Sequence, residues 1–178
     1  MKKSFYSSFI EPALIYGCIT GIIYIIISVF LSIMNANFSV ARQIVDIAVP
    51  VGGLIFCLLM YRKEYCDNFI TYGRAFGMGI SILLIFGVTV AIYNYIYTRY
   101  VNPDFFNQAQ VMMEEKLINK NLDARQIEFA MEKSAWVRTP LMNSLMMIVN
   151  IVFTGGIASL IIAAFIKKEN EDPFKDVI

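Results

Sequence analysis

Long apolar runs alternate with short polar stretches along this chain, and three of the runs contain no charged residue. They cover residues 13–34, 75–98 and 140–166. A helix needs about 20 apolar residues to cross the roughly 30 Å hydrocarbon layer of a membrane. Each run is long enough, so the pattern predicts three transmembrane helices.

A fourth run, residues 44–61, is shorter and carries Asp46 and Pro50 near its start. We expect Asp46 at the membrane surface and Pro50 in the first turns of a span, where proline is tolerated. A re-entrant segment is the alternative. The first run has an alternative too, since a basic start and a cleavage-like site at residues 39–41 are features of signal peptides. Its apolar stretch is longer than a signal-peptide core, which favours a retained anchor.

The polar stretch at residues 99–139 separates the third and fourth predicted spans. Tyrosines precede it, as expected where a helix leaves the bilayer. Asn102, Pro103 and Asp104 form a turn sequence, and two segments with apolar residues at helical spacing follow. We therefore predict an all-α polytopic membrane protein with a single membrane domain over residues 1–178. Its four transmembrane helices form a bundle, and an extramembrane helical hairpin joins the third helix to the fourth.

Lysine and arginine placement predicts the orientation of these helices, because basic residues favour the cytoplasmic side. The residues that would share one side are Lys2, Lys3, Arg62, Lys63, Arg74, Lys167, Lys168 and Lys175. The insert on the other side is longer, and its basic residues are balanced by acidic ones. Both termini are therefore expected in the cytoplasm.

Small residues recur every four positions in the predicted spans, a spacing that lets helices approach closely in lipid. The residues are Gly17, Gly21, Gly73, Gly77, Gly155 and Ser159. They indicate packing within the bundle, with dimerisation as the alternative.

The amino-acid composition argues against several kinds of functional site. Apolar residues make up 58% of the chain and charged residues 16%, with a net charge of +1 that gives no reason to expect nucleic acid. There is no histidine, the commonest general base and metal ligand, and the three cysteines have no paired spacing. We therefore assign no catalytic residue, cofactor or metal.

Two groups of polar residues remain candidates for a functional role. Asn150 is a candidate polar intramembrane site that could line a path with Thr154 and Ser159, although a hydrogen bond between helices explains it as well. The insert also holds carboxylates that could do acid–base work or serve only as caps and solvated surface. They are Asp104, Glu114, Glu115, Asp123, Glu128 and Glu132.

Four stretches together carry a family resemblance. They are "GCITGIIYIIISVFL" from residue 17, "YRKEYCDNFITYGRAFGMGI" from residue 61, "YNYIYTRYVNPDF" from residue 93 and "SLIIAAFIKKENEDPF" from residue 159. In order and spacing they resemble the domain of unknown function 4199, a family of small bacterial membrane proteins found mainly in Bacteroidota. The most specific parts are Asn102-Pro103-Asp104 and Lys167-Lys168. The resemblance implies a four-helix layout in a bacterial inner membrane and no assigned activity.

The first functional hypothesis is a non-enzymatic accessory or assembly protein of the cell envelope, located in the inner membrane. Its environment is the lipid bilayer, and its partner would be another membrane protein or a second copy of itself. A small oligomeric transporter or channel is the first alternative, and an envelope-lipid enzyme using the insert carboxylates is the second.

Overall fold

The computed structural model describes residues 9–34 and 36–168, and its regular elements are helices. Four long apolar helices are suited by length and composition to crossing a membrane. They are α1 (Glu11–Ile33), α2 (Val40–Tyr65), α3 (Tyr72–Ile96, continued by the π-helix η2, Tyr97–Val101) and α6 (Pro140–Ile166). Between the last two lie α4 (Phe105–Ile118), α5 (Ala124–Lys133) and the short 3₁₀ helix η3 (Ala135–Arg138). The predicted all-α bundle with its inserted hairpin is confirmed.

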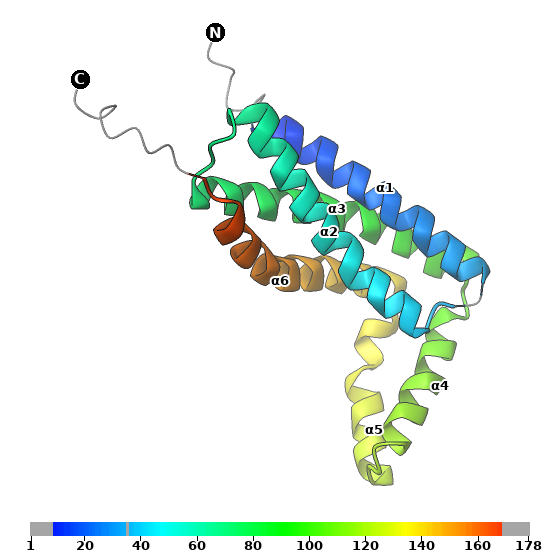
Figure 1. The fold of residues 1–178 in the computed structure, drawn as a ribbon. Helices are drawn as coiled ribbons and strands as arrows, with labels where there is room; N and C mark the ends of the chain where they lie inside the picture. Colours follow the sequence, from blue (N-terminus) through cyan, green and yellow to red (C-terminus); the bar gives the residue numbers. More distant parts are fainter. Residues whose placement is uncertain (1–8, 35, 169–178) are drawn as a thin grey trace, which may run out of the picture.

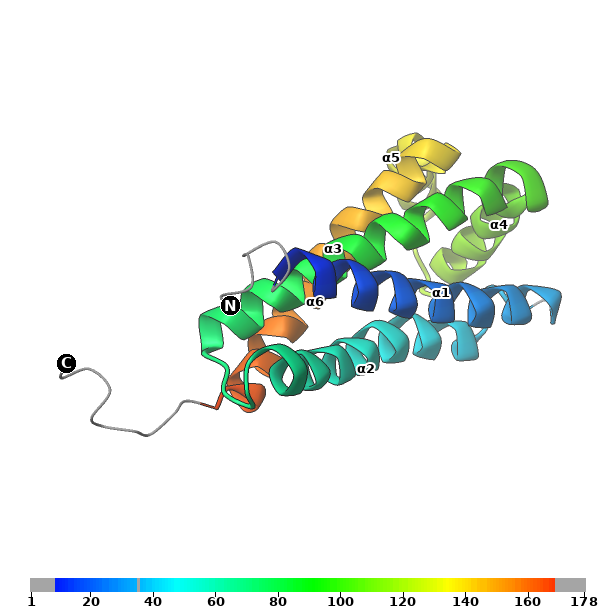
Figure 2. The same ribbon diagram turned by 90° about the horizontal axis from the view of Figure 1, so that it is seen from above.

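The four long helices run up and down in chain order, and α3 is the central one. It makes its most extensive contacts with α6 and α1, while α2 touches α1, α3 and α6 over shorter stretches. The hairpin of α4 and α5 leaves the bundle at one end (Figure 1; Figure 2). We call this the hairpin end, and the opposite end, where residues 66–71 join α2 to α3, the closed end.

The second span is one continuous helix that includes Pro50. It begins directly after Ser39, whose side chain accepts a hydrogen bond from the backbone N–H of Arg42 (3.2 Å). The helix therefore extends beyond the apolar run of residues 44–61 at both ends. Proline has no N–H, so the backbone carbonyl of Asp46, four residues earlier, lacks its helical donor.

The closed end holds the main core, in which Leu58, Tyr61 and Met78 are fully buried. An antiparallel backbone bridge fastens the α2–α3 connection to the end of α6. Ile70 and Lys168 exchange N–H···O bonds of 2.9 and 3.0 Å. These contacts join the three helices α2, α3 and α6 at one point.

Hydrogen bonds within the hairpin stabilise its helices and join them to each other. Asp123 and Gln126 form the predicted capping box at the start of α5. Arg138 then ties the returning chain to both helices, since it donates to Gln110 Oε1 (3.0 Å) and to the backbone carbonyl of Met131. Lys2, Lys3 and Lys175, which contribute to the predicted orientation, lie outside the described residues.

Candidate functional site

A polar cavity of about 380 Å³ lies inside the bundle at the hairpin end. All four long helices and the start of α4 contribute to its lining. The lining residues are Ser28, Asn37, Phe38, Arg42, Asp46, Tyr93, Asn94, Tyr97, Phe105, Asn143, Met146, Met147 and Asn150. Cavities of this size are typical of small-molecule sites.

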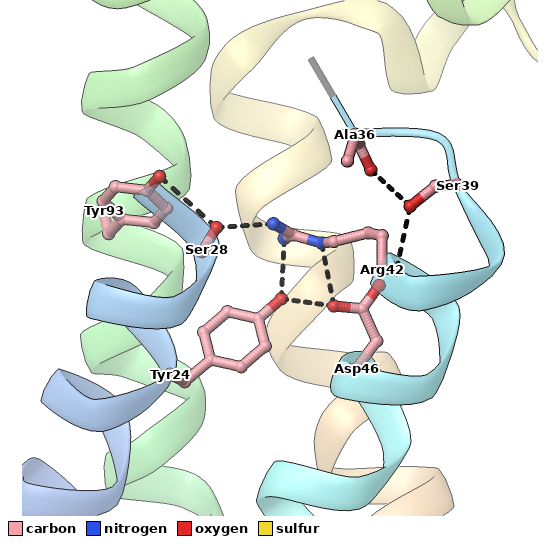
Figure 3. A network of polar contacts seen from close by, with 7 residues as sticks. All are labelled: Tyr24, Ser28, Ala36, Ser39, Arg42, Asp46 and Tyr93. Carbon is pink, nitrogen blue, oxygen red and sulfur yellow. Dashed lines mark hydrogen bonds and ion pairs between the residues drawn. The ribbon is translucent and has the colours of Figure 1, made fainter. Parts of the chain in front are cut away.

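An ion pair within the first turns of α2 lines the cavity, and Figure 3 shows it with its hydrogen-bond partners. Arg42 Nε lies 3.0 Å from Asp46 Oδ1, one helical turn away. Tyr24 of α1 joins the pair, because its hydroxyl donates to Asp46 Oδ1 (2.7 Å) and accepts from Arg42 Nη2 (2.8 Å). The Arg42 side chain is only 18% exposed, whereas that of Asp46 is 44% exposed. An unpaired charge within a membrane helix costs up to about 3 kcal/mol on insertion scales, and pairing the two charges lowers that cost.

Hydroxyl groups extend this network from α2 to α1 and α3. Arg42 Nη1 donates to Ser28 Oγ, and Ser28 Oγ donates to the hydroxyl of Tyr93 (3.3 Å; Figure 3). About one turn after Tyr93, at the start of η2, the hydroxyl of Tyr97 lies 2.6 Å from Ser32 Oγ and accepts from Asn37 Nδ2 (3.1 Å). These hydrogen bonds hold the helices together at the hairpin end and leave the cavity between them open.

Amide side chains form the opposite wall. Asn94 Nδ2 donates to Asn143 Oδ1 (2.8 Å) and to Ser144 Oγ (3.1 Å), which joins α3 to α6. Asn150 lies two turns further along α6 and lines the cavity. Among the described residues its side chain has no hydrogen-bond partner, and the residue is exposed.

A larger apolar groove of about 620 Å³ between α2 and α6 adjoins the polar cavity. The two share Asp46, Met147 and Asn150. The remaining groove residues are mainly apolar: Tyr24, Ile47, Pro50, Val51, Leu54, Leu83, Phe86, Ile151, Thr154, Gly155, Ile157, Ala158 and Ile161. The whole site is therefore amphiphilic, polar at the hairpin end and apolar toward the middle of the bundle.

The small residues singled out in the sequence occupy different environments. A Cβ atom at Gly17 would lie 2.8 Å from Ile85 of α3, and one at Gly21 would lie 2.8 Å from Thr89. A Cβ at Gly155 would lie 2.8 Å from Leu83. Each distance is too short for real atoms, so these three glycines permit close contacts with α3.

The other members of that set are less crowded or lie deeper. A Cβ at Gly73 would meet nothing within 4 Å, and one at Gly77 would make ordinary contact with Phe9. Ser159 is fully buried against Gly79, and its hydroxyl has no partner among the described residues.

The residues of the family-like motif have structural contacts. The backbone N–H of Asn102 donates to Tyr97 O (2.8 Å) and closes the π-helix, and Asp104 Oδ1 accepts from Asn107 Nδ2 (2.7 Å). Pro103 lies in the turn between them. Lys167 ends α6, and Lys168 forms the bridge at the closed end.

Sequence reasoning missed the ion pair. Nothing in the hydrophobic pattern indicated that Arg42 and Asp46 pair with each other and both contact Tyr24 of α1. A usable signal was present, because Arg42 and Asp46 are four residues apart. Tyr24 and Ser28 share that spacing, as do Tyr93 and Tyr97. Such spacing places polar groups on one helix face.

A family model described as "Protein of unknown function (DUF4199)" matches residues 15–168 of the chain. No curated protein and no solved structure matches the chain. Within the described residues, no group of three or more Cys, Asp or Glu residues is placed to hold a metal ion.

Proposed function

This chain belongs to the DUF4199 family, and for it we propose a non-enzymatic accessory role in the membrane that depends on holding one amphiphilic molecule between α2 and α6. The observation that carries the proposal is that the polar cavity and the apolar groove share Asp46, Met147 and Asn150 in their linings. A site with one polar end and one long apolar part matches a lipid-like molecule better than a water-soluble one.

The contacts around the site support binding over acid–base catalysis. Arg42, Asp46 and Tyr24 contact one another, and these contacts hold the two charges in fixed positions. A general base needs a lone pair directed at a substrate proton and a pKa near the working pH. The ion pair instead offers fixed charges that orient a headgroup, which is the behaviour of a binding site.

A groove-filling substitution tests the proposal. Thr154 is exposed and lines the groove, so Thr154→Phe places a ring in the space meant for the amphiphile. Val149→Phe is the matched control, because Val149 is 61% exposed on the same helix and lines neither cavity. Lipid retained after gentle detergent purification, counted by native mass spectrometry, should fall in the first variant and stay unchanged in the second. Equal retention in both variants contradicts the proposal.

The proposed location is the bacterial inner membrane, with both termini in the cytoplasm and the hairpin outside. The basic residues Arg62 and Lys63 near the closed end support this orientation. A cysteine at Asn121 should react with a membrane-impermeant thiol reagent in intact spheroplasts, and a cysteine at Lys63 should not. Native Cys66 adds little background, because burial raises the pKa of its thiol and keeps it protonated. Labelling in the opposite sense would reverse the orientation.

Transport is the second candidate function, since Asn150 and Thr154 both line the groove. A path lined by Asn150, Thr154 and Ser159 would require Ser159 to be accessible, yet this residue is buried against Gly79. Transport predicts that Asn150→Leu abolishes movement of a labelled amphiphile between the leaflets of a vesicle. Binding without transport predicts no such movement with either the unaltered protein or the variant.

A further inference from the structure

The lining of the polar cavity contains one positively charged and one negatively charged residue. Arg42 and Asp46 are the charged residues of the lining, and the others provide hydroxyl, amide or apolar groups. A headgroup with a single negative charge would gain from Arg42 but would lie beside the Asp46 carboxylate. Like charges at such a distance oppose each other, so a purely anionic headgroup is disfavoured.

Resting on the proposed function, we propose that the amphiphile is a zwitterionic phospholipid with a primary ammonium, of the phosphatidylethanolamine type. Its phosphate lies toward Arg42, its ammonium toward Asp46, and an acyl chain fills the apolar groove. This assignment matches each part of the ligand with a group of the complementary kind.

Arg42 has unused donors for the phosphate. A guanidinium carries five N–H groups. Three of them reach Asp46, Ser28 and Tyr24, which leaves two. Arginine with two free N–H groups is well suited to phosphate oxygens. The Asn150 amide, without a side-chain partner among the described residues, adds a further donor on the facing wall.

Asp46 has unused acceptors for the ammonium. Both of its contacts to Tyr24 and Arg42 end on Oδ1, so Oδ2 is available to a ligand. The backbone carbonyl of Asp46 is also without a helical donor because Pro50 follows four residues later. A primary ammonium brings three N–H donors to these acceptors, whereas a trimethylated ammonium brings none.

The groove has the length and character for an acyl chain. Along α6 it extends from Met147 to Ile161, which is roughly 21 Å at 1.5 Å per residue. Leu83 and Phe86 of α3 contribute to its lining. A chain entering from the headgroup site would thus remain among apolar side chains along the whole groove.

Competition between lipids with identical acyl chains tests the assignment. The full-length protein in detergent is mixed with equal amounts of phosphatidylethanolamine, phosphatidylglycerol and phosphatidylcholine, and bound lipid is counted by native mass spectrometry. We expect phosphatidylethanolamine to be retained about tenfold more than either competitor, the ratio that one charge-assisted hydrogen bond supplies. Glycerophosphoethanolamine, which has the headgroup without chains, should not displace it.

Asp46→Asn provides the sharpest variant, since it keeps the shape and removes the negative charge. It should lose the preference for phosphatidylethanolamine and accept phosphatidylglycerol at least equally, while Asp104→Asn on the hairpin changes nothing. Arg42→Gln should weaken both lipids about tenfold, with folding checked by thermal melting. An unaltered preference in a folded Asp46→Asn variant, or equal retention of all three lipids by the native chain, overturns the assignment but leaves the proposed function standing. Retention no higher than in Thr154→Phe for every lipid overturns both.

Discussion

The two ends of the bundle are built in different ways. At the closed end, large side chains such as Leu58, Tyr61 and Met78 are buried together, and a backbone bridge joins the connection after α2 to α6. At the hairpin end, polar side chains from α1, α2, α3 and α6 hydrogen-bond across a cavity. One end is held by filling space, and the other by directed bonds that leave space open.

The difference shows how a small membrane protein can be stable and still contain an open cavity. Lipid tails are as apolar as leucine, so burial from water does not drive helices together, and packing and hydrogen bonds must do so. The closed end provides the packing. The hairpin end can then keep an open cavity because its helices are positioned by Arg42, Asn94 and their partners.

The largest effect is expected from Leu58→Ala at the closed end. Leu58 is fully buried, whereas Leu59 on the same helix is 40% exposed. In soluble proteins such a change costs 2–5 kcal/mol through lost transfer energy and a cavity, and in lipid the cavity part dominates, so we expect about 2–3 kcal/mol. Leu59→Ala should cost less than about 1 kcal/mol. Unfolding in mixed micelles measures both, and equal losses would mean that the closed end is not held by packing.

Gly17→Ala should have the next largest effect. Its new methyl group would lie 2.8 Å from Ile85 and 2.9 Å from the backbone carbonyl of Ile82, which forces α1 away from α3. Such overpacking costs about 1–3 kcal/mol. Gly52→Ala has open space around it and should stabilise α2 by about 0.5–1 kcal/mol. A similar stability change in both variants would show that the α1–α3 contact is loose.

A smaller effect is expected at the hairpin end from Asn94→Leu. The change removes the hydrogen bonds from α3 to Asn143 and Ser144, and such bonds in membranes average about 0.6 kcal/mol with a maximum near 1.7. Asn150→Leu is the matched control, because Asn150 has no side-chain partner among the described residues. It should leave stability unchanged and reduce lipid retention. The reverse pattern would assign Asn150 a structural role.

The hairpin carboxylates should matter least. Asp104 and Asp123 make local hydrogen bonds, and Glu114, Glu115, Glu128 and Glu132 are exposed. Single Asn or Gln substitutions should each change stability by no more than about 0.5 kcal/mol and leave lipid retention intact. Loss of the cellular phenotype by one such variant at normal protein level would favour the enzyme hypothesis, since removing a general acid or base costs about 10²- to 10⁴-fold in rate.

Hydrophobic patterning was sufficient to predict the helices but not the site. The uncharged runs identify three spans, and the capping sequence from Asp123 to Gln126 identifies the second hairpin helix. The cavity depends on which way Arg42 and Asp46 turn, and this is decided by Tyr24 and Ser28 on another helix. A hydropathy window averages these residues with their neighbours. The gap between α2 and α6 depends on tertiary geometry that no local pattern contains.

The bridge between Ile70 and Lys168 has a consequence for biosynthesis. Its two halves are separated by about 100 residues of chain, and ribosomes add roughly 5–20 residues per second. The backbone groups of Ile70 must therefore wait about 5–20 s for their partner. During that interval the core at the closed end lacks the side chains that α6 contributes to it, such as Ile162 and Ala163. The closed end is thus the last part of the fold to be completed. Until α6 is made, this end of the nascent chain is the most open to proteases and to contacts with other proteins.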